Sequence, residues 1–284
     1  MLDELPKAIE GGDLDVFLQP KVDLRTRAPY GFEALVRWRR NGQLIPPVEF
    51  IEVAEEGGHI KALDLSMIAS ASRLVADWNR RHGSEFSLSV NISALHLLDD
   101  RDTEAVIEAI EALTLPRALL TIEITETVEL ADWRRVSHAI ERLRQTGCRI
   151  SIDDFGTGYS SLAYLRAIPA DELKIDKSLV SEIETSAESQ FILDAVIDLA
   201  RSLDMTVIVE GIERESQIDI LRDLGCQRGQ GFLYGRPQPA LEALRDATMG
   251  APDKCANYAS APVTTVHDAF FNDIMPAVSE IPGE

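Results

Sequence analysis

The sequence predicts an α/β fold, a modified TIM-type (β/α)8 barrel with an antiparallel first strand. Short apolar runs alternate with longer stretches of helical period over residues 16–235, which is typical of repeated strand and helix units. Two helix-to-strand junctions have nearly the same sequence, and the connection between the first two strands is unusually short. Together these observations favour one closed barrel over two unrelated domains.

Eight short apolar runs have the length of strands. They cover residues 16–20, 31–38, 87–92, 119–125, 149–153, 172–175, 206–210 and 231–234. Residues 21–28 join the first two, whereas a parallel crossover needs about a dozen residues or more. We therefore expect the first two strands to pair in antiparallel orientation, as a departure from a regular barrel.

Amphipathic helices are expected between the strands. One apolar stripe consists of Ile60, Leu63, Met67, Ile68, Ala71, Leu74, Val75 and Trp78, and Gly83 follows it as a helix cap. A second stripe consists of Phe191, Ile192, Ala195, Val196, Leu199, Ala200 and Leu203. Both stripes predict helices that pack on the sheet.

The repeated junctions are Leu143-Arg144-Gln145-Thr146-Gly147-Cys148 and Leu221-Arg222-Asp223-Leu224-Gly225-Cys226. Glycine can adopt the left-handed conformation that ends a helix, so Gly147 and Gly225 are each expected just before a strand.

The chain is predicted to divide near residue 248. Residues 1–248 carry the strand and helix pattern, and residues 249–284 are expected to be a C-terminal extension, because residues 250–265 are rich in Ala, Pro, Ser and Thr. Partial disorder and a short helix over residues 267–275 are the two alternatives for this extension.

Composition excludes several classes of function. A formal charge of -20 argues against binding of DNA or RNA polymers, which requires clustered Lys and Arg. No run approaches the ~18 apolar residues of a membrane helix, and the acidic start does not resemble a signal peptide. Three widely spaced cysteines indicate neither a disulfide framework nor a zinc site. We expect a cytoplasmic protein without a membrane segment.

Polar side chains gather at the predicted strand ends, and a barrel of this kind has its active site at the C-terminal mouth. These residues are Glu33, Asn91, Glu123, Glu126, Asp153, Asp154, Lys174, Asp176, Glu210 and Glu213, with Gln230 just before the last strand. Any one acid could be a solvated charge at a strand end. The whole set predicts a functional site, because buried carboxylates are rare unless they are paired.

Five carboxylates are expected to converge from the strand ends, those of Glu33, Glu123, Asp153, Asp154 and Glu210. They would repel one another, and divalent cations remove this repulsion. Ligands that are all oxygen, with one amide among the carboxylates, suit Mg²⁺ or Mn²⁺ rather than Zn²⁺. The single lysine, Lys174, has two interpretations: it neutralises the cluster, or it acts on an attacking water or a phosphoryl oxygen. The loop that follows Asp153 and Asp154 contains Gly156 and Gly158, which allow it to order around metal and substrate.

These residues resemble one family, the EAL-domain phosphodiesterases of bacterial cyclic di-GMP signalling. The similarity extends over about residues 5–241. Its markers are Glu33-Ala34-Leu35-Val36-Arg37, Asn91, Glu123 with Glu126, Asp153-Asp154-Phe155-Gly156-Thr157-Gly158-Tyr159-Ser160, Lys174-Ile175-Asp176, Glu210 with Glu213, and Gln230-Gly231-Phe232. This ordered set is far more specific than an isolated Glu-Ala-Leu triplet.

The resemblance implies a barrel with an antiparallel first strand and hydrolysis of cyclic di-GMP to linear pGpG, with water activated by two Mg²⁺ or Mn²⁺ ions. It assigns Glu33, Asn91, Glu123 and Asp153 to one cation, and Asp153, Asp154 and Glu210 to the second. Lys174 would contact the water nucleophile, and Glu33, Asp153, Asp154 and Glu210 complete the catalytic set. Gln19, Arg37, Asp176 and Gln230 would bind the substrate, and Glu126 and Glu213 would support the loop and the metal ligands. The resemblance also implies a homodimer.

Two rival functions remain. A degenerate relative would bind cyclic di-GMP as an inactive receptor, but such a protein should have lost metal ligands, and every ligand position is filled here. An enolase-type isomerase also combines strand-end acids with lysine. The Asp153-Asp154 pair and the Asn91 amide fit phosphodiester hydrolysis better.

Overall fold

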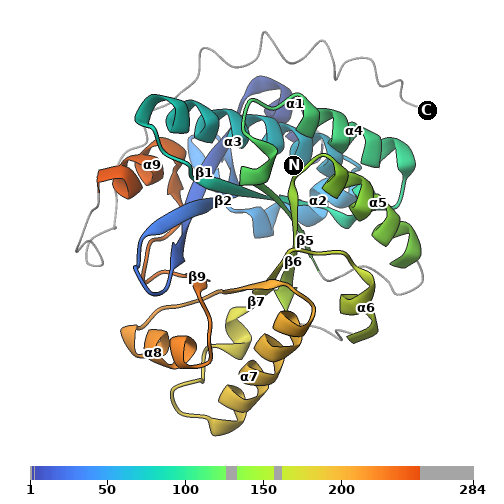
Figure 1. Cartoon of the computed structure of the whole chain (residues 1–284). Coiled ribbons are helices and arrows are strands. Elements are labelled where there is room, and N and C mark those ends of the chain that lie inside the picture. The colour runs from blue at the N-terminus through green and yellow to red at the C-terminus, as the bar shows by residue number, and fades with distance from the viewer. Residues whose placement is uncertain (1, 3, 126–132, 157–161, 250–284) are drawn as a thin grey trace.

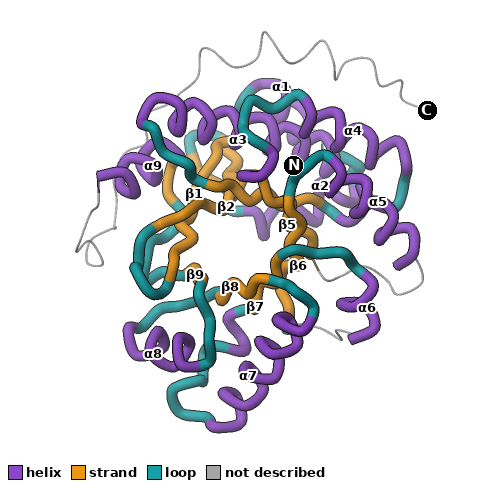
Figure 2. The backbone as a smooth tube through the Cα atoms, viewed as in Figure 1, coloured by secondary structure: helices purple, strands orange, loops and turns teal. Residues whose placement is uncertain are grey.

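The computed structural model describes residues 2, 4–125, 133–156 and 162–249. Its strands form a ring, and the helices lie outside this ring (Figures 1 and 2). Strand order is β10-β1-β9-β8-β7-β6-β5-β4-β2-β3, and an additional pairing of β1 with β2 closes the barrel. The modified (β/α)8 barrel is confirmed.

The strands that form the barrel are β1 (Leu14–Asp23), β2 (Pro29–Arg40), β4 (Ser87–Ile92), β5 (Leu120–Thr125), β6 (Arg149–Phe155), β7 (Glu172–Ile175), β8 (Thr206–Val209) and β9 (Arg228–Gln230). Two short strands, β3 (Gln43–Ile45) and β10 (Gln238–Pro239), were not predicted. Strand β1 is antiparallel to both β2 and β9, and the other barrel pairs are parallel. The short connection therefore predicted the strand direction correctly.

The prediction that residues 231–234 form the eighth strand is wrong. Strand β9 ends at Gln230, and the chain turns at Gly231, whose carbonyl accepts from the backbone N–H of Tyr234 at 3.1 Å. A Cβ atom at Gly231 would lie only 2.1 Å from the carbonyl oxygen of Ile212. The segment looked like a strand because its side chains are apolar, but Leu233 donates to Ile212 in the loop after β8.

The outer layer contains nine α-helices and four 3-10 helices within the described residues. The α-helices are α1 (Leu5–Gly11), α2 (Ile51–Glu56), α3 (Ile60–His82), α4 (Asp100–Glu111), α5 (Trp133–Gln145), α6 (Leu162–Ala167), α7 (Ala187–Ser202), α8 (Glu215–Asp223) and α9 (Ala240–Met249). The 3-10 helices are η1 (Pro47–Glu49), η2 (Ala94–Leu97), η3 (Arg117–Leu119) and η5 (Lys177–Leu179).

Helix α3 buries the stripe that the sequence predicted, and Gly83 ends it with a φ of 64°. The stripe predicted for α7 is wrong in part. Phe191, Ile192 and Ala195 are exposed, whereas Leu193, Ile197 and Ala200 face the barrel. The error arose because α7 is apolar on two faces, and periodicity alone did not show which face packs on the sheet. The two repeated junctions agree with prediction, with φ of 92° at Gly147 and 84° at Gly225.

The interior of the barrel is polar, and the apolar core lies between the strands and the helices. Successive strand residues point to opposite faces. Buried polar residues along the strands are Gln19, Lys21, Glu33, Ser89, Thr121, Glu123, Ser151, Asp153, Glu172, Lys174 and Gln230. Their immediate neighbours, such as Phe32, Ile122 and Leu173, belong to the apolar core. This arrangement places charged side chains inside the ring.

Three predictions concern residues that the structure does not describe. Glu126, residues 157–161 of the loop that contains Gly158, and most of the predicted extension, residues 250–284, lie outside the described residues. Among the described helices, none has the length and apolar character required to cross a membrane.

Candidate active site

Carboxylates from different strands meet at the C-terminal mouth of the barrel. Glu33 on β2, Glu123 on β5 and Asp153 on β6 place carboxylate oxygens within 4.8 Å of one another. Asp153, Asp154 and Glu210 form a second group by the same measure. Asp153 belongs to both groups, so the two clusters share one carboxylate.

A β-bulge brings the two neighbouring aspartates to the same side. The register between β6 and β7 shifts after Ile152. Ile152 pairs with Leu173 and Phe155 pairs with Ile175, so β6 contains one extra residue between these pairs. Asp154 adopts a left-handed φ of 57°, which is unfavourable for a residue with a Cβ atom. Consecutive strand residues normally point in opposite directions. The bulge re-aims Asp154 toward the mouth beside Asp153.

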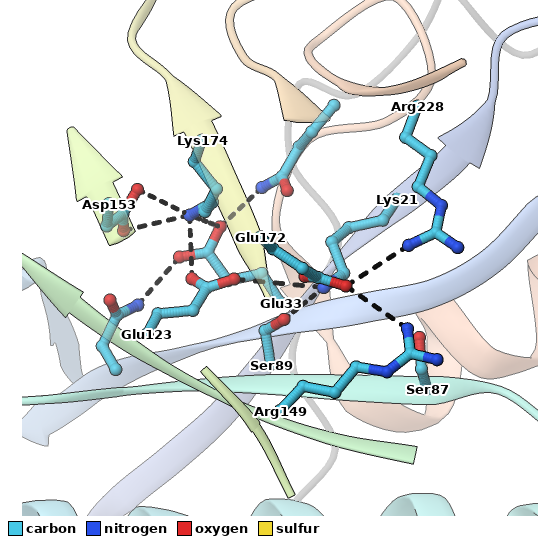
Figure 3. Close-up of polar contacts among 12 residues, drawn as sticks. Lys21, Glu33, Ser87, Ser89, Glu123, Arg149, Asp153, Glu172, Lys174 and Arg228 are labelled. Carbon is cyan, nitrogen blue, oxygen red and sulfur yellow. Dashed lines mark hydrogen bonds and ion pairs between the residues drawn. The ribbon is translucent and has the colours of Figure 1, made fainter. Parts of the chain in front are cut away.

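Lys174 lies at the centre of the carboxylates. Its Nζ is 2.8 Å from Glu123 Oε2 and from Glu210 Oε1, and 3.0 Å from Asp153 Oδ1. Glu33 Oε2 is 3.7 Å away. Figure 3 shows this ammonium directed at Glu123 and Asp153. The lysine predicted from the motif is thus in contact with four of the predicted metal ligands.

The charges of this cluster change the acidity of its members. Burial raises the pKa values of Glu33, Asp153 and Asp154, and it raises the pKa of Glu210 to about 8. Burial disfavours the Lys174 ammonium, but the surrounding carboxylates more than offset this and hold the pKa of Lys174 well above its usual value. Lys174 is therefore a cation at neutral pH and a hydrogen-bond donor.

Two amide side chains donate to Glu33, and a third contacts one of them. Asn91 Nδ2 donates to Glu33 Oε1 at 2.9 Å, and Gln230 Nε2 donates to Glu33 Oε2 at 2.6 Å. Gln230 also donates to Gln19 Oε1 at 3.0 Å, and Gln19 donates to the carbonyl of Gly235. Gln19 and Gln230 are buried, and Gln230 orients Glu33, while the predicted contact of both glutamines with substrate stays a prediction. Asn91 keeps its amide oxygen as the atom that can bind a cation.

The other predicted site residues lie at the rim. The guanidinium of Arg37 packs over the ring of Phe17 at 5.3 Å. Asp176 accepts from Ser178 N–H and begins η5. Glu213 is exposed and lines a hollow of about 310 Å³ together with Phe232, Leu233 and Arg236. The supporting role of Glu213 stays a prediction, and Glu126 lies outside the described residues.

A second buried layer of charge was not predicted from the sequence. Lys21 on β1 donates to Ser89 and lies 3.9 Å from Glu123 Oε1. Glu172 forms ion pairs with Arg149 at 3.5 Å and Arg228 at 3.3 Å, as Figure 3 shows. The available signal was the recurrence of polar residues at every second strand position, as in Ser87-Leu88-Ser89-Val90-Asn91.

The donor set fits a hard divalent cation. Both groups offer carboxylate oxygens only, and Asn91 adds an amide oxygen. Magnesium and manganese prefer such ligands, whereas zinc prefers nitrogen and sulfur. A raised pKa means that nearby positive charge does not offset the cost of burying the carboxylate. A bound cation would supply this charge. The buried acidic cluster is therefore compatible with a metal site.

Cation binding is expected to release protons at neutral pH. Burial raises the pKa of Glu210 to about 8, so this carboxyl group is partly protonated at pH 7. A ligand carboxylate must be ionised, so the apparent affinity for Mn²⁺ should rise with pH up to about 8. Titration calorimetry in two buffers of different ionisation enthalpy measures this release. Equal heats in both buffers would contradict it.

Sequence comparisons match this chain to one family of known proteins. A family model described as "EAL domain" matches residues 2–237. The oxygen sensor protein DosP of Escherichia coli (strain K12) is 38% identical over 240 residues, which cover 84% of this chain and 30% of DosP. The cyclic di-GMP phosphodiesterase NbdA of Pseudomonas aeruginosa is 37% identical over 247 residues, which cover 87% of this chain and 31% of NbdA. The chain thus spans about three tenths of the length of these two relatives.

The fold also matches solved structures. PaMucR phosphodiesterase in complex with c-di-GMP superposes with a TM-score of 0.78 at 36% identity. The match covers 85% of this chain and 98% of the solved chain.

Proposed function

Because the chain belongs to the EAL-domain family, we propose that it is a phosphodiesterase that hydrolyses cyclic di-GMP to linear pGpG with the help of two Mg²⁺ or Mn²⁺ ions. The observation that carries this proposal is the pair of carboxylate groups that share Asp153. A solved relative, PaMucR, is a phosphodiesterase in complex with c-di-GMP. An inactive receptor would be expected to have lost part of this ligand set.

The proposed ligand sets use residues that the strands bring together. Glu33, Asn91, Glu123 and Asp153 would hold one cation, and Asp153, Asp154 and Glu210 would hold the other. Two such cations lower the pKa of an attacking water and offset the charge that develops on the phosphoryl oxygens. Gln230 and Asn91 hold Glu33 in place through its two oxygens.

Lys174 has the properties of a hydrogen-bond donor rather than a general base. Its ammonium remains protonated at neutral pH, because carboxylates surround it. It therefore donates hydrogen bonds to the attacking water or to a phosphoryl oxygen, and it stabilises negative charge there. No covalent nucleophile is required. Gln19, Arg37, Asp176 and Gln230 are the residues proposed to bind the dinucleotide, with Glu126 and Glu213 in support.

The proposal is tested by incubating the purified protein with cyclic di-GMP and Mg²⁺, Mn²⁺ or Ca²⁺, and separating the products by chromatography. We expect pGpG with Mg²⁺ or Mn²⁺, and little with Ca²⁺, which prefers longer bonds and more ligands. Binding of cyclic di-GMP without any product under either active metal would favour the receptor function instead.

We also propose that the protein is a homodimer, as its resemblance to the family implies. Light scattering after size exclusion measures its mass in solution. A monomer at every concentration tested would contradict this proposal.

A further inference from the structure

Lys21 is a buried lysine that the proposed reaction does not use. It lies on β1, and its side chain is 1% exposed inside the barrel. Gln19 is level with Glu33 at the mouth, and Lys21 is level with Gly31, two residues deeper. Lysine is rarely buried in full unless it has a partner, so its contacts should explain its presence.

The contacts of Lys21 lead to Glu123. Its Nζ donates to the hydroxyl of Ser89 and lies 3.9 Å from Glu123 Oε1. The other oxygen of this carboxylate, Oε2, accepts from Lys174 at 2.8 Å. Glu123 is thus held between two lysines that approach different oxygens (Figure 3).

The Oε1 atom of Glu123 agrees with this arrangement. It is buried, and apart from its ion pair with Lys21 it has no hydrogen-bond partner among the described residues. Its position therefore depends on Lys21 more than that of Oε2, which Lys174 holds.

Building on the proposed function, we propose that Lys21, held in place by Ser89, is a positioning residue that fixes the carboxylate of Glu123 in the orientation of a cation ligand. It approaches Glu123 from the deep side of the barrel, away from the mouth. A ligand that is fixed before binding loses less conformational freedom, and loss of such a supporting partner typically lowers metal affinity by about 10- to 100-fold.

Lys21 also has an effect that would change metal affinity in the opposite direction. The ammonium of Lys21 also repels a cation, so its removal would tighten metal binding if only this repulsion mattered. Lys21 lies deeper in the barrel than the carboxylates at the mouth, and Glu123 Oε1 has no hydrogen-bond partner among the described residues that could replace it. We therefore expect orientation to dominate and affinity to fall.

The test is titration of Mn²⁺ into the intact protein by calorimetry. Lys21→Met removes the ammonium and keeps the length of the side chain, and Ser89→Ala removes the hydroxyl that accepts from Lys21. Each variant should bind Mn²⁺ about 10-fold more weakly or worse, with turnover at saturating Mn²⁺ within about threefold of the unmodified protein. This separation of affinity from turnover would not follow from a general loss of structure.

Ser151→Ala is the matched control. Ser151 pairs with Glu123 in the sheet and is fully buried, but its hydroxyl has no hydrogen-bond partner among the described residues. It should leave Mn²⁺ affinity unchanged. Thermal unfolding in the presence of chelator checks the fold of each variant. If Lys21→Met does not fold, the Mn²⁺ affinity of Ser89→Ala tests the proposal.

Unchanged or tighter Mn²⁺ binding in the folded variants would overturn the role of Lys21 and leave the proposed function intact. A protein without substitutions that binds no Mn²⁺ would instead overturn the proposed function, and this inference with it. The two failures are therefore distinguishable.

Discussion

Asp153→Asn is expected to lower turnover of cyclic di-GMP by about a thousand-fold or more, equivalent to roughly 4 kcal/mol of transition-state stabilisation. Asp153 is the residue that both carboxylate groups share, so its loss affects both proposed cation positions at once. Asparagine preserves the shape of the side chain but provides one neutral oxygen in place of two charged ones. Turnover and Mn²⁺ affinity should therefore fall together.

Asp171→Asn is the control for this substitution. Asp171 immediately precedes β7 at the opposite end of the barrel, where it accepts from Ile150 N–H at 2.9 Å and pairs with Arg144. The change in charge is the same, but turnover should stay close to that of the unmodified protein. Equal losses in the two variants would show that Asp153 acts through overall stability rather than through the site.

Lys174→Ala is expected to lower turnover at saturating metal by roughly 100- to 1000-fold, the effect of removing one well-placed donor from a developing charge. Its Nζ contacts Glu123, Asp153 and Glu210, all of them proposed metal ligands. Lys174 lies among the proposed ligand oxygens themselves, where its ammonium competes with a cation, whereas Lys21 lies deeper in the barrel. Loss of Lys174 leaves these carboxylates more negative, so affinity for Mn²⁺ should not fall.

A metal titration of turnover separates the two interpretations of Lys174. A low plateau at all concentrations of Mn²⁺ supports action on the water or the phosphate. Full recovery at high Mn²⁺ would show that Lys174 only neutralises the cluster. Lys21→Met should give the reverse pattern, with weaker Mn²⁺ binding and a nearly normal plateau.

Much of the fold followed from local sequence. Strands β4 and β7 have the predicted bounds, and in both of them polar and apolar residues alternate. The antiparallel first strand followed from the length of one loop, which sterics alone restrict. Residues 231–234 were misassigned because an apolar turn that packs against Ile212 has the composition of a strand, and only the tertiary contact distinguishes them.

The sequence predicted which residues form the site better than it predicted how their side chains are placed. Strand ends of a barrel converge, so Glu33, Glu123 and Asp153 could be grouped before their distances were known. The bulge at Asp154 and the central place of Lys174 could not, because they depend on register and on side-chain packing. Lys21 was missed because its partners, Ser89 and Glu123, are distant in sequence and no local rule joins them.

The central claim is that the carboxylate groups joined by Asp153 hold a pair of cations. Anomalous diffraction from crystals grown with Mn²⁺ tests it most directly, since manganese is identified by its own signal. We predict two manganese peaks at the barrel mouth, one beside Glu33, Glu123 and Asp153 and one beside Asp153, Asp154 and Glu210. A single peak, or peaks away from Asp153, would contradict the account.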